Sequence, residues 1–148
     1  MRYHVVMSIP IILLDTNIFI SALLGPTGAS REIIRKCLKG CYQPIMGNTL
    51  FREHEDLLQR RKLFRNCILN NAERNKLFDS FLSVCQWVSI YYGWRPNLKD
   101  EGDNHLIELA VAGGAQYLVT KNTRDFINPE LRFPQFQIVR PEKFLKEV

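Results

Sequence analysis

The sequence predicts an α/β fold in which helices cover a parallel β-sheet. Short apolar runs alternate with segments of helical periodicity along the chain, which is the pattern of repeated strand–helix–strand units. Gly25-Pro26 and Gly113-Gly114 fall between such segments, where helices commonly end. At 148 residues the chain is long enough to bury a sizeable core. We expect residues 1–148 to form a single domain.

The first of five predicted strands, residues 11–14, contains four aliphatic residues and stands between a proline and a polar segment. A continuous apolar run of this length is typical of a strand buried on both faces of a sheet. The other strands are expected at residues 43–46, 87–91, 117–120 and 136–139.

Helices are expected near residues 16–24, 30–38, 49–60, 72–84 and 104–112, and a short one from Pro141. Pro141 suits the first turn of the last helix, because the N–H that proline lacks would have no helical partner there. Open α/β sheets carry their sites at the carboxyl ends of the strands. The polar residues that follow the strands are therefore the candidates for a site.

The formal net charge is +5, and basic residues gather in two places. The first cluster contains Arg31, Arg35 and Lys36, and the second contains Arg60, Arg61 and Lys62. Either cluster alone is typical of a solvated helix face. Two clusters beside a set of acids favour a surface that binds a polyanion such as RNA, with a salt-sensitive affinity for phosphates and no base specificity.

Cysteine usage and hydropathy indicate a cytoplasmic protein that does not enter a membrane. The cysteines include no CxxC pair, so we expect reduced structural thiols at Cys37, Cys41, Cys67 and Cys85. The apolar runs fall far short of the roughly 20 residues that a membrane span needs. The first ten residues lack the apolar core of a secretory signal.

Asp15 ends the first predicted strand, with Thr16 and Asn17 beside it. Two interpretations are open. Asp15 can cap the helix that follows, because a short acid accepts hydrogen bonds from free backbone N–H groups. Alternatively, it belongs to a site that acids from other segments complete.

Glu53 lies in the predicted helix 49–60, on the face that Leu50 and Leu57 make apolar. We therefore expect a buried carboxylate, which needs a cation or hydrogen-bond donors. A salt bridge to a nearby arginine would satisfy this need, and so would a metal ion. Asp103 raises the same question, since it follows two other acids and begins the helix 104–112, where it is either a helix cap or a metal ligand.

The strand at residues 117–120 ends in Thr120 and is followed by Asn122 and Asp125, which repeats the arrangement at Asp15. Oxygen donors without a cysteine or histidine among them suit Mg²⁺ or Mn²⁺. The chain has no strong Ser/His/Asp set and no phosphate-binding glycine motif. The histidines are expected on the surface or at helix caps: His4, His54 and His105.

The segments "LLDTNIFISALL", "FREHEDLL" and "LKDEGDNHLIELAVAGGAQYLVTKNTRDF" resemble, in this order and spacing, the PIN-domain nucleases. The likeness is greatest to members that act as toxins of bacterial toxin–antitoxin pairs, and it extends from Ile11 to the closing "IVRPEKFL". The resemblance implies a three-layer α/β/α sandwich around a central parallel sheet. It also implies catalytic acids at Asp15, Glu53 and Asp103 that hold Mg²⁺ or Mn²⁺, with Asn17 as a supporting residue.

The fourth position of the family pattern lies in "TKNTRDF". Many members carry an aspartate two residues after the threonine, where this chain has Asn122. Asp125 is the nearest acid and the candidate for the fourth catalytic residue, with Thr120 and Asn122 as supporting residues. With Asn122 in place of the family's aspartate, a fourth carboxylate ligand is missing at this position, which would weaken the binding of a second metal ion.

By this resemblance the protein is a metal-dependent ribonuclease in which metal-activated water hydrolyses RNA, and its partners are a small antitoxin and a second copy of the chain. The alternative is a PIN-like module that binds RNA or a protein without cutting, which Asn122 favours and the three acids Asp15, Glu53 and Asp103 oppose. A receiver-type phosphorylated domain is excluded, because "PIMGNT" provides no acceptor aspartate after the strand 43–46.

Overall fold

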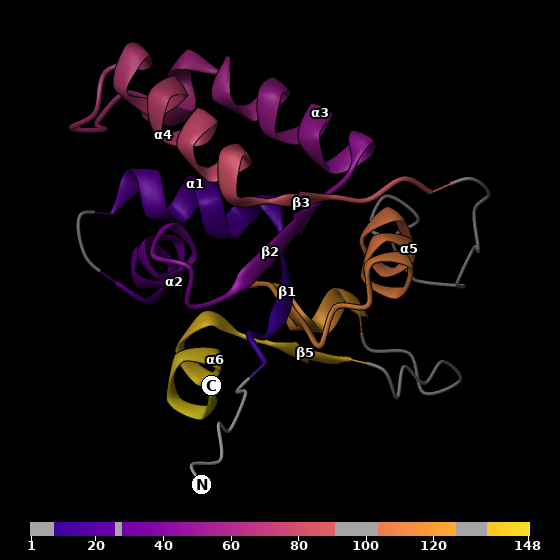
Figure 1. Cartoon of the computed structure of the whole chain (residues 1–148). Helices are drawn as coiled ribbons and strands as arrows, with labels where there is room; N and C mark the ends of the chain where they lie inside the picture. The colour runs from indigo at the N-terminus through magenta and orange to yellow at the C-terminus, as the bar shows by residue number, and fades with distance from the viewer. Residues whose placement is uncertain (1–7, 26–27, 91–103, 127–135) are drawn as a thin grey trace, which may run out of the picture.

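The computed structural model describes residues 8–25, 28–90, 104–126 and 136–148 (Figure 1). Its centre is a five-stranded sheet in which every adjacent pair of strands is parallel, in the order β3-β2-β1-β4-β5. The strands are β1 (Ile11–Leu14), β2 (Gln43–Met46), β3 (Gln86–Trp87), β4 (Tyr117–Val119) and β5 (Gln137–Val139). The predicted parallel α/β fold is confirmed.

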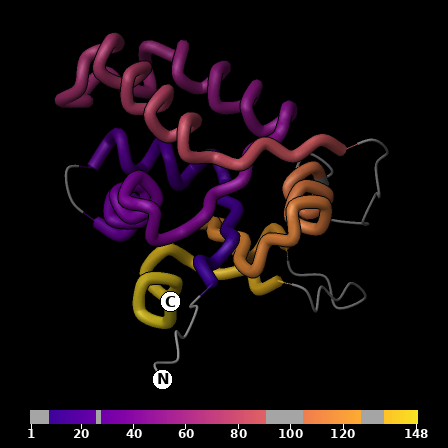
Figure 2. Tube along the Cα trace, viewed as in Figure 1, coloured from indigo at the N-terminus to yellow at the C-terminus, as the bar shows by residue number. Residues whose placement is uncertain are grey.

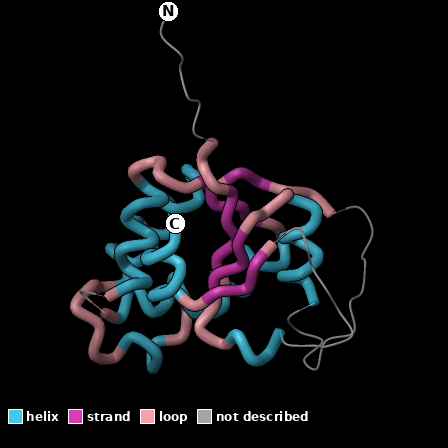
Figure 3. Tube along the Cα trace, turned by 90° about the horizontal axis from the view of Figure 1, so that it is seen from below, coloured by secondary structure: helices cyan, strands magenta, loops and turns pink. Residues whose placement is uncertain are grey.

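Helices lie on both sides of the strands, which makes three layers (Figure 3). The described α-helices are α1 (Thr16–Leu24), α2 (Ala29–Leu38), α3 (Asn48–Leu58), α4 (Asn71–Val84), α5 (Asn104–Gly113) and α6 (Pro141–Glu147). Helix α2 packs on α1, α4 and α6 on one side, while α5 packs on β1 and β4 from the other side (Figures 1 and 3). This is the expected three-layer α/β/α arrangement.

The pairing of β1 with β4 fixes the position of the site. Leu14 is in register with Val119, and the Asp15 N–H donates to the Val119 carbonyl at 3.0 Å. Parallel strands in register end at the same edge of the sheet, so Asp15 and Thr120 must leave the sheet side by side. The two residues are far apart in the sequence, and only this pairing brings them together.

Aromatic rings fill the space between helices α1, α3 and α4. Helices α3 and α4 run in opposite directions (Figure 2), and the Phe51 ring stacks on Phe78 at a centroid distance of 6.0 Å. Phe19 of α1 is fully buried and contacts Phe78 and Phe81, each at 5.4 Å. Such pairs contribute beyond the area that they bury, so α1 and α4 are held by one aromatic cluster.

Most predicted elements agree with the structure, and the differences are local. Strands 11–14 and 43–46 and helix 16–24 have the predicted bounds. Helix α3 ends at Leu58, before the predicted end at residue 60, and a 3₁₀ turn, η1 (Arg61–Phe64), follows it. Burial of Phe64 explains the break, because its ring lies under the Arg74 guanidinium at 4.3 Å. A second 3₁₀ turn, η3 (Thr123–Phe126), follows β4. None of the described helices has the length and apolarity needed to cross a bilayer.

The prediction of a surface position for His54 is wrong. The buried stripe of α3 is Leu50, His54 and Leu58, and only 1% of His54 is exposed. His54 Nδ1 donates to the Leu50 carbonyl at 2.9 Å, which leaves Nε2 as a buried acceptor without a hydrogen-bond partner among the described residues. The ring packs against Phe19 and Phe78, and this burial lowers the pKa of His54 to about 4.

The buried imidazole makes the fold sensitive to acid. Because the pKa of His54 is lower in the folded than in the unfolded chain, stability falls as the pH drops from about 6.5 toward 4. The full shift corresponds to a loss on the order of 3 kcal/mol. We expect His54→Phe, which keeps an aromatic ring, to flatten this dependence. Urea unfolding between pH 7.5 and 4.5 in EDTA checks this, and equal slopes for both proteins would contradict it.

Candidate active site

Asp15 caps helix α1. Its backbone is extended, and its Oδ1 accepts the Thr16 N–H at 2.7 Å. The capping interpretation is therefore correct as far as geometry goes. It does not account for the whole side chain, because a cap needs only one of the two carboxylate oxygens.

The second oxygen joins Asp15 to the end of β4. Asp15 Oδ2 accepts a hydrogen bond from Thr120 Oγ1 at 2.8 Å and from Asn17 Nδ2 at 3.2 Å. Thr120 Oγ1 in turn accepts the Asn122 N–H at 3.1 Å, and Asn17 Oδ1 accepts the Lys121 N–H at 3.2 Å. The sequence predicted Asn17 and Thr120 as supporting residues, and the structure places both against the Asp15 carboxylate.

Burial dominates the electrostatics of Asp15. The residue is 8% exposed, and desolvation raises the pKa of its carboxyl group above the ordinary value. Hydrogen bonds from Thr120 and Thr16 act in the opposite direction, and the negative charge of Glu53 raises the pKa further. Asp15 and Glu53, from different elements, are thus close enough to repel each other. A divalent cation between them would relieve that repulsion.

Glu53 is not buried as predicted. Its side chain is 42% exposed and lies beside the buried stripe of α3. The cause is a shift of one residue, because the helix turns Leu50, His54 and Leu58 inward in place of residues 50, 53 and 57. No arginine pairs with Glu53 among the described residues. Its partner is His105 of α5, with Nε2 at 3.2 Å from Glu53 Oε2.

Sequence reasoning missed His105 as a site residue. Its side chain is 15% exposed, and its Nδ1 is buried without a hydrogen-bond partner in the described part of the chain. The contact links α3 to α5 at the point where α5 begins. The sequence feature that could have identified His105 is its place in "GDNHLIEL", two residues after the predicted acid Asp103. The sequence alone does not show that Glu53 of α3 lies beside it.

The structure does not place the other two predicted acids, Asp103 and Asp125, beside Asp15 and Glu53. Asp103 lies outside the described residues. Asn122 has an exposed side chain, and Asp125 lies half-buried in η3, where its N–H donates to the Asn122 carbonyl at 3.1 Å. Within the described ranges no group of three or more His, Cys, Asp and Glu side chains is arranged to hold a metal ion. The described part of the site is the pair Asp15 and Glu53 with its polar support.

The two basic clusters lie on helix surfaces. Arg35 forms an ion pair with Glu32 at 2.9 Å and Arg60 with Asp56 at 2.7 Å, so the charges of these two arginines are partly neutralised. Arg61 and Lys62 are exposed on η1, and Arg31 and Lys36 are half-exposed on α2. Arg60 lies between α3 and η1, two residues after α3 ends. The second cluster therefore follows the helix that carries Glu53.

A family model described as PIN domain matches residues 11–124. The chain belongs to the PIN-domain family. PIN domains are generally nucleases and typically use divalent metal ions. The match runs from β1 to residue 124, one residue before Asp125, and therefore includes Asp15, Glu53 and Thr120.

Among solved structures, the PIN domain is similar to a chain in the crystal structure of VapBC2 from Rickettsia felis bound to a DNA fragment from their promoter. The TM-score is 0.56 at 17% sequence identity, and the alignment covers 88% of this chain and 98% of that chain. At this identity the likeness establishes the shared fold. Comparison with curated proteins finds no match.

The donor set fits a divalent cation. Mg²⁺ in proteins is commonly held by one or two carboxylates together with waters and substrate phosphates. Asp15 and Glu53 supply two carboxylates that repel each other, and the histidine beside Glu53 restricts its orientation. The PIN domain thus offers hard oxygen donors where a positive charge would be stabilising.

Removing the Asp15 charge should stabilise the protein when no metal is present. Because the pKa of Asp15 is raised by folding, its charged form destabilises the fold at neutral pH. Asp15→Asn should therefore unfold at a higher temperature than wild type in EDTA at pH 7.5. Asp79→Asn, which changes an exposed acid on α4, is the matched control.

Metal should reverse this order. A ligand at one hundred times its Kd stabilises the protein that binds it by about 2.7 kcal/mol. Mg²⁺ or Mn²⁺ should raise the Tm of wild type and of Asp79→Asn by several degrees and leave Asp15→Asn unchanged. Equal metal shifts in all three proteins would place the cation elsewhere.

Proposed function

We propose that this PIN domain is a Mg²⁺- or Mn²⁺-dependent ribonuclease. The observation that carries the proposal is the buried Asp15 carboxylate at the end of β1, held on both oxygens and repelled by Glu53. A purely structural cap would not require a second carboxylate nearby. Family membership supports the nuclease class, and the net charge of +5 supports a polyanionic substrate.

Asp15 and Glu53 would hold the cation, and Asp103, which lies outside the described residues, would be the third acid. When bound, the cation would supply Lewis-acid stabilisation of the phosphoryl oxygens and lower the pKa of an attacking water. Asp125 is the candidate for a fourth acid. With Asn122 at the family's fourth position, one tightly held cation is the simplest expectation.

The chain's own residues keep the Asp15 carboxylate in one orientation. Thr16 holds one oxygen and Thr120 the other, at 2.7 and 2.8 Å. Asn17 contacts the second oxygen and also the Lys121 backbone, so it locks α1 to the end of β4. Preorganisation of this kind reduces the rearrangement that the reaction demands. Asn17 and Thr120 are positioning residues.

RNA would be held through its phosphates. Arg60 follows the end of α3, Arg61 and Lys62 lie on η1, and Arg31, Arg35 and Lys36 lie on α2. Contacts of this type fix a strand without reading its bases. The substrate proposed is therefore RNA of no fixed sequence at these contacts.

We also propose that the protein is the toxin of a toxin–antitoxin pair, inhibited by a small antitoxin and dimeric. The support is the likeness to a chain of VapBC2, whose crystal structure contains DNA from their promoter. A second candidate function is a PIN domain that binds RNA without cutting. The neutral and exposed Asn122 side chain and the half-exposed Glu53 favour that candidate.

Cleavage of a mixed RNA pool separates the two functions. We expect cutting with Mg²⁺ or Mn²⁺ and none with EDTA. Asp15→Asn and Asp103→Asn should each lower the rate by about 100-fold or more, since even indirect support of a metal ligand is worth 10- to 100-fold. Glu53→Gln should act similarly, while Glu55→Gln, an exposed acid on the same helix, should not.

Each other outcome has a definite meaning. Binding of RNA without cutting in either metal would reject the nuclease in favour of the binding module. Cutting that survives both aspartate substitutions would show a contaminating enzyme or a misplaced site.

The contribution of Arg61 and Lys62 on η1 to RNA binding can be measured from the salt dependence of the binding constant. For single strands each phosphate contact changes the slope of log Kobs against log salt by about 0.7. Arg61→Gln with Lys62→Gln should reduce the slope by about 1.4. The pair Lys143→Gln and Lys146→Gln removes the same charge from exposed positions on α6, far from α3 in Figure 1, and should leave the slope unchanged. Equal effects of the two pairs would mean that only net charge matters.

A further inference from the structure

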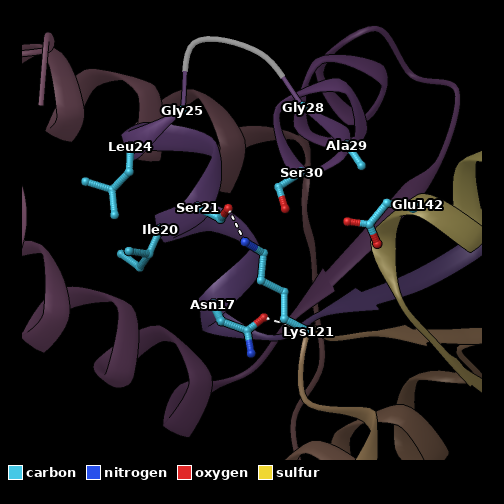
Figure 4. A pocket seen from close by; sticks show the side chains of 10 residues that line it. All are labelled: Asn17, Ile20, Ser21, Leu24, Gly25, Gly28, Ala29, Ser30, Lys121 and Glu142. Atoms are coloured by element: carbon cyan, nitrogen blue, oxygen red, sulfur yellow. Dashed lines mark hydrogen bonds between the residues drawn. The ribbon is translucent and has the colours of Figure 1, made fainter.

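A cavity of about 580 Å³ lies beside the Asp15 network. Its walls come from α1, the start of α2, Lys121 after β4 and Glu142 of α6 (Figure 4). Pockets of 300 to 1,000 Å³ are the usual size for small ligands. None of the roles assigned above uses this space, and most of its polar lining is outside the predicted set of site residues.

Lys121 supplies the positive charge of the cavity. Its Nζ donates to Ser21 Oγ at 2.5 Å, and Figure 4 shows the side chain lying along α1 between Asn17 and Ser21. Lys121 is half-buried and forms no ion pair with any described residue. An ammonium group has three N–H donors, so two are left for a ligand. A half-buried cation without a counter-ion favours an anionic one.

The rest of the lining suits the other parts of a nucleotide. Ile20 and Leu24 are one turn apart on α1 and give an aliphatic surface, of which Leu24 is 42% exposed. Ser30 and Glu142 line the opposite side (Figure 4). Ser30 is only 6% exposed, whereas the exposed Glu142 carboxylate, 3.8 Å from Arg140 Nε, can accept hydrogen bonds from sugar hydroxyl groups. A cation, an apolar surface and hydroxyl acceptors are thus present in one space.

Asn17 connects this cavity to the candidate active site. Its Nδ2 donates to Asp15 Oδ2 at 3.2 Å, and its Oδ1 accepts the Lys121 N–H at 3.2 Å. The cavity is therefore separated from the Asp15 carboxylate by one side chain. A strand with one phosphate at Asp15 and Glu53 would place an adjacent nucleotide at Lys121.

We propose that this cavity is a nucleotide-binding subsite for single-stranded RNA, in which Lys121 Nζ contacts the phosphate next to the one at Asp15. The inference rests on the proposed nuclease function and names how its substrate is held. Lys121 binds substrate here and takes no part in the bond-breaking step.

Binding of a fluorescein-labelled eight-nucleotide RNA tests the proposal, with fluorescence anisotropy in EDTA so that no metal-dependent cutting occurs. Lys121→Gln should weaken binding about tenfold, as expected for one charge-assisted hydrogen bond, and reduce the salt slope by about 0.7. Lys76→Gln removes an exposed lysine of α4 and should change neither value. Ala29→Trp, which fills the cavity from α2, should weaken binding without changing the charge.

The proposal is overturned if Lys121→Gln and Lys76→Gln bind this RNA alike, or if Ala29→Trp binds as tightly as wild type. A competition arm identifies the ligand, because adenosine 5′-monophosphate should displace the RNA at lower concentration than inorganic phosphate. Equal competition would mean that the cavity binds a bare anion, which also overturns the nucleotide subsite. Cleavage by wild type is measured separately, so loss of the subsite and loss of the nuclease are distinguishable.

Discussion

The hydrogen bond from Thr120 to Asp15 is the contact on which the site depends. It exists only because β1 and β4 are neighbours in register, with Leu14 beside Val119. A buried carboxylate without donors would take up a proton or destabilise the fold. Thr120 and Thr16 each satisfy one oxygen, and Asn17 ties the arrangement to Lys121. The sheet order therefore supplies the hydrogen bond that opposes the rise in the pKa of Asp15, and it fixes the orientation of the carboxylate.

The ionised Asp15 carboxylate destabilises the fold but is the form that a metal site would need. Burial and the charge of Glu53 both disfavour the ionised form of Asp15, yet only that form binds a cation strongly. The protein without metal thus holds a repulsion that metal binding would release, so part of the binding free energy offsets a cost already present in the fold. The aromatic cluster around Phe19 stabilises α1, the helix that Asp15 caps. The same cluster contains His54, so it adds sensitivity to acid.

The sequence predicted what depends on local patterns. Strand 11–14 and helix 16–24 follow from one apolar run and one periodic segment, and two similar strand ends identify Asp15 and Thr120 as candidates. That these two residues lie side by side depends on the pairing of β1 with β4, which no local pattern predicts. Helix α3 shows the limit. Leu50, Leu57 and Leu58 are compatible with a stripe through residue 53 or through residue 54, and Phe19 and Phe78 from other helices decide for His54. The contact of His105 with Glu53 depends on the same unpredictable packing.

Asn122, which stands where many PIN domains have an aspartate, directly follows Lys121, which lines the cavity beside Asp15. Its N–H still supports Thr120, so the backbone at this position keeps its role although the side chain is neutral and exposed. An aspartate there would place a negative charge next to Lys121 in the chain. The Lys121 ammonium forms no ion pair with any described residue. A neutral residue at position 122 therefore adds no negative charge beside Lys121, which is consistent with the phosphate contact that we propose for this lysine.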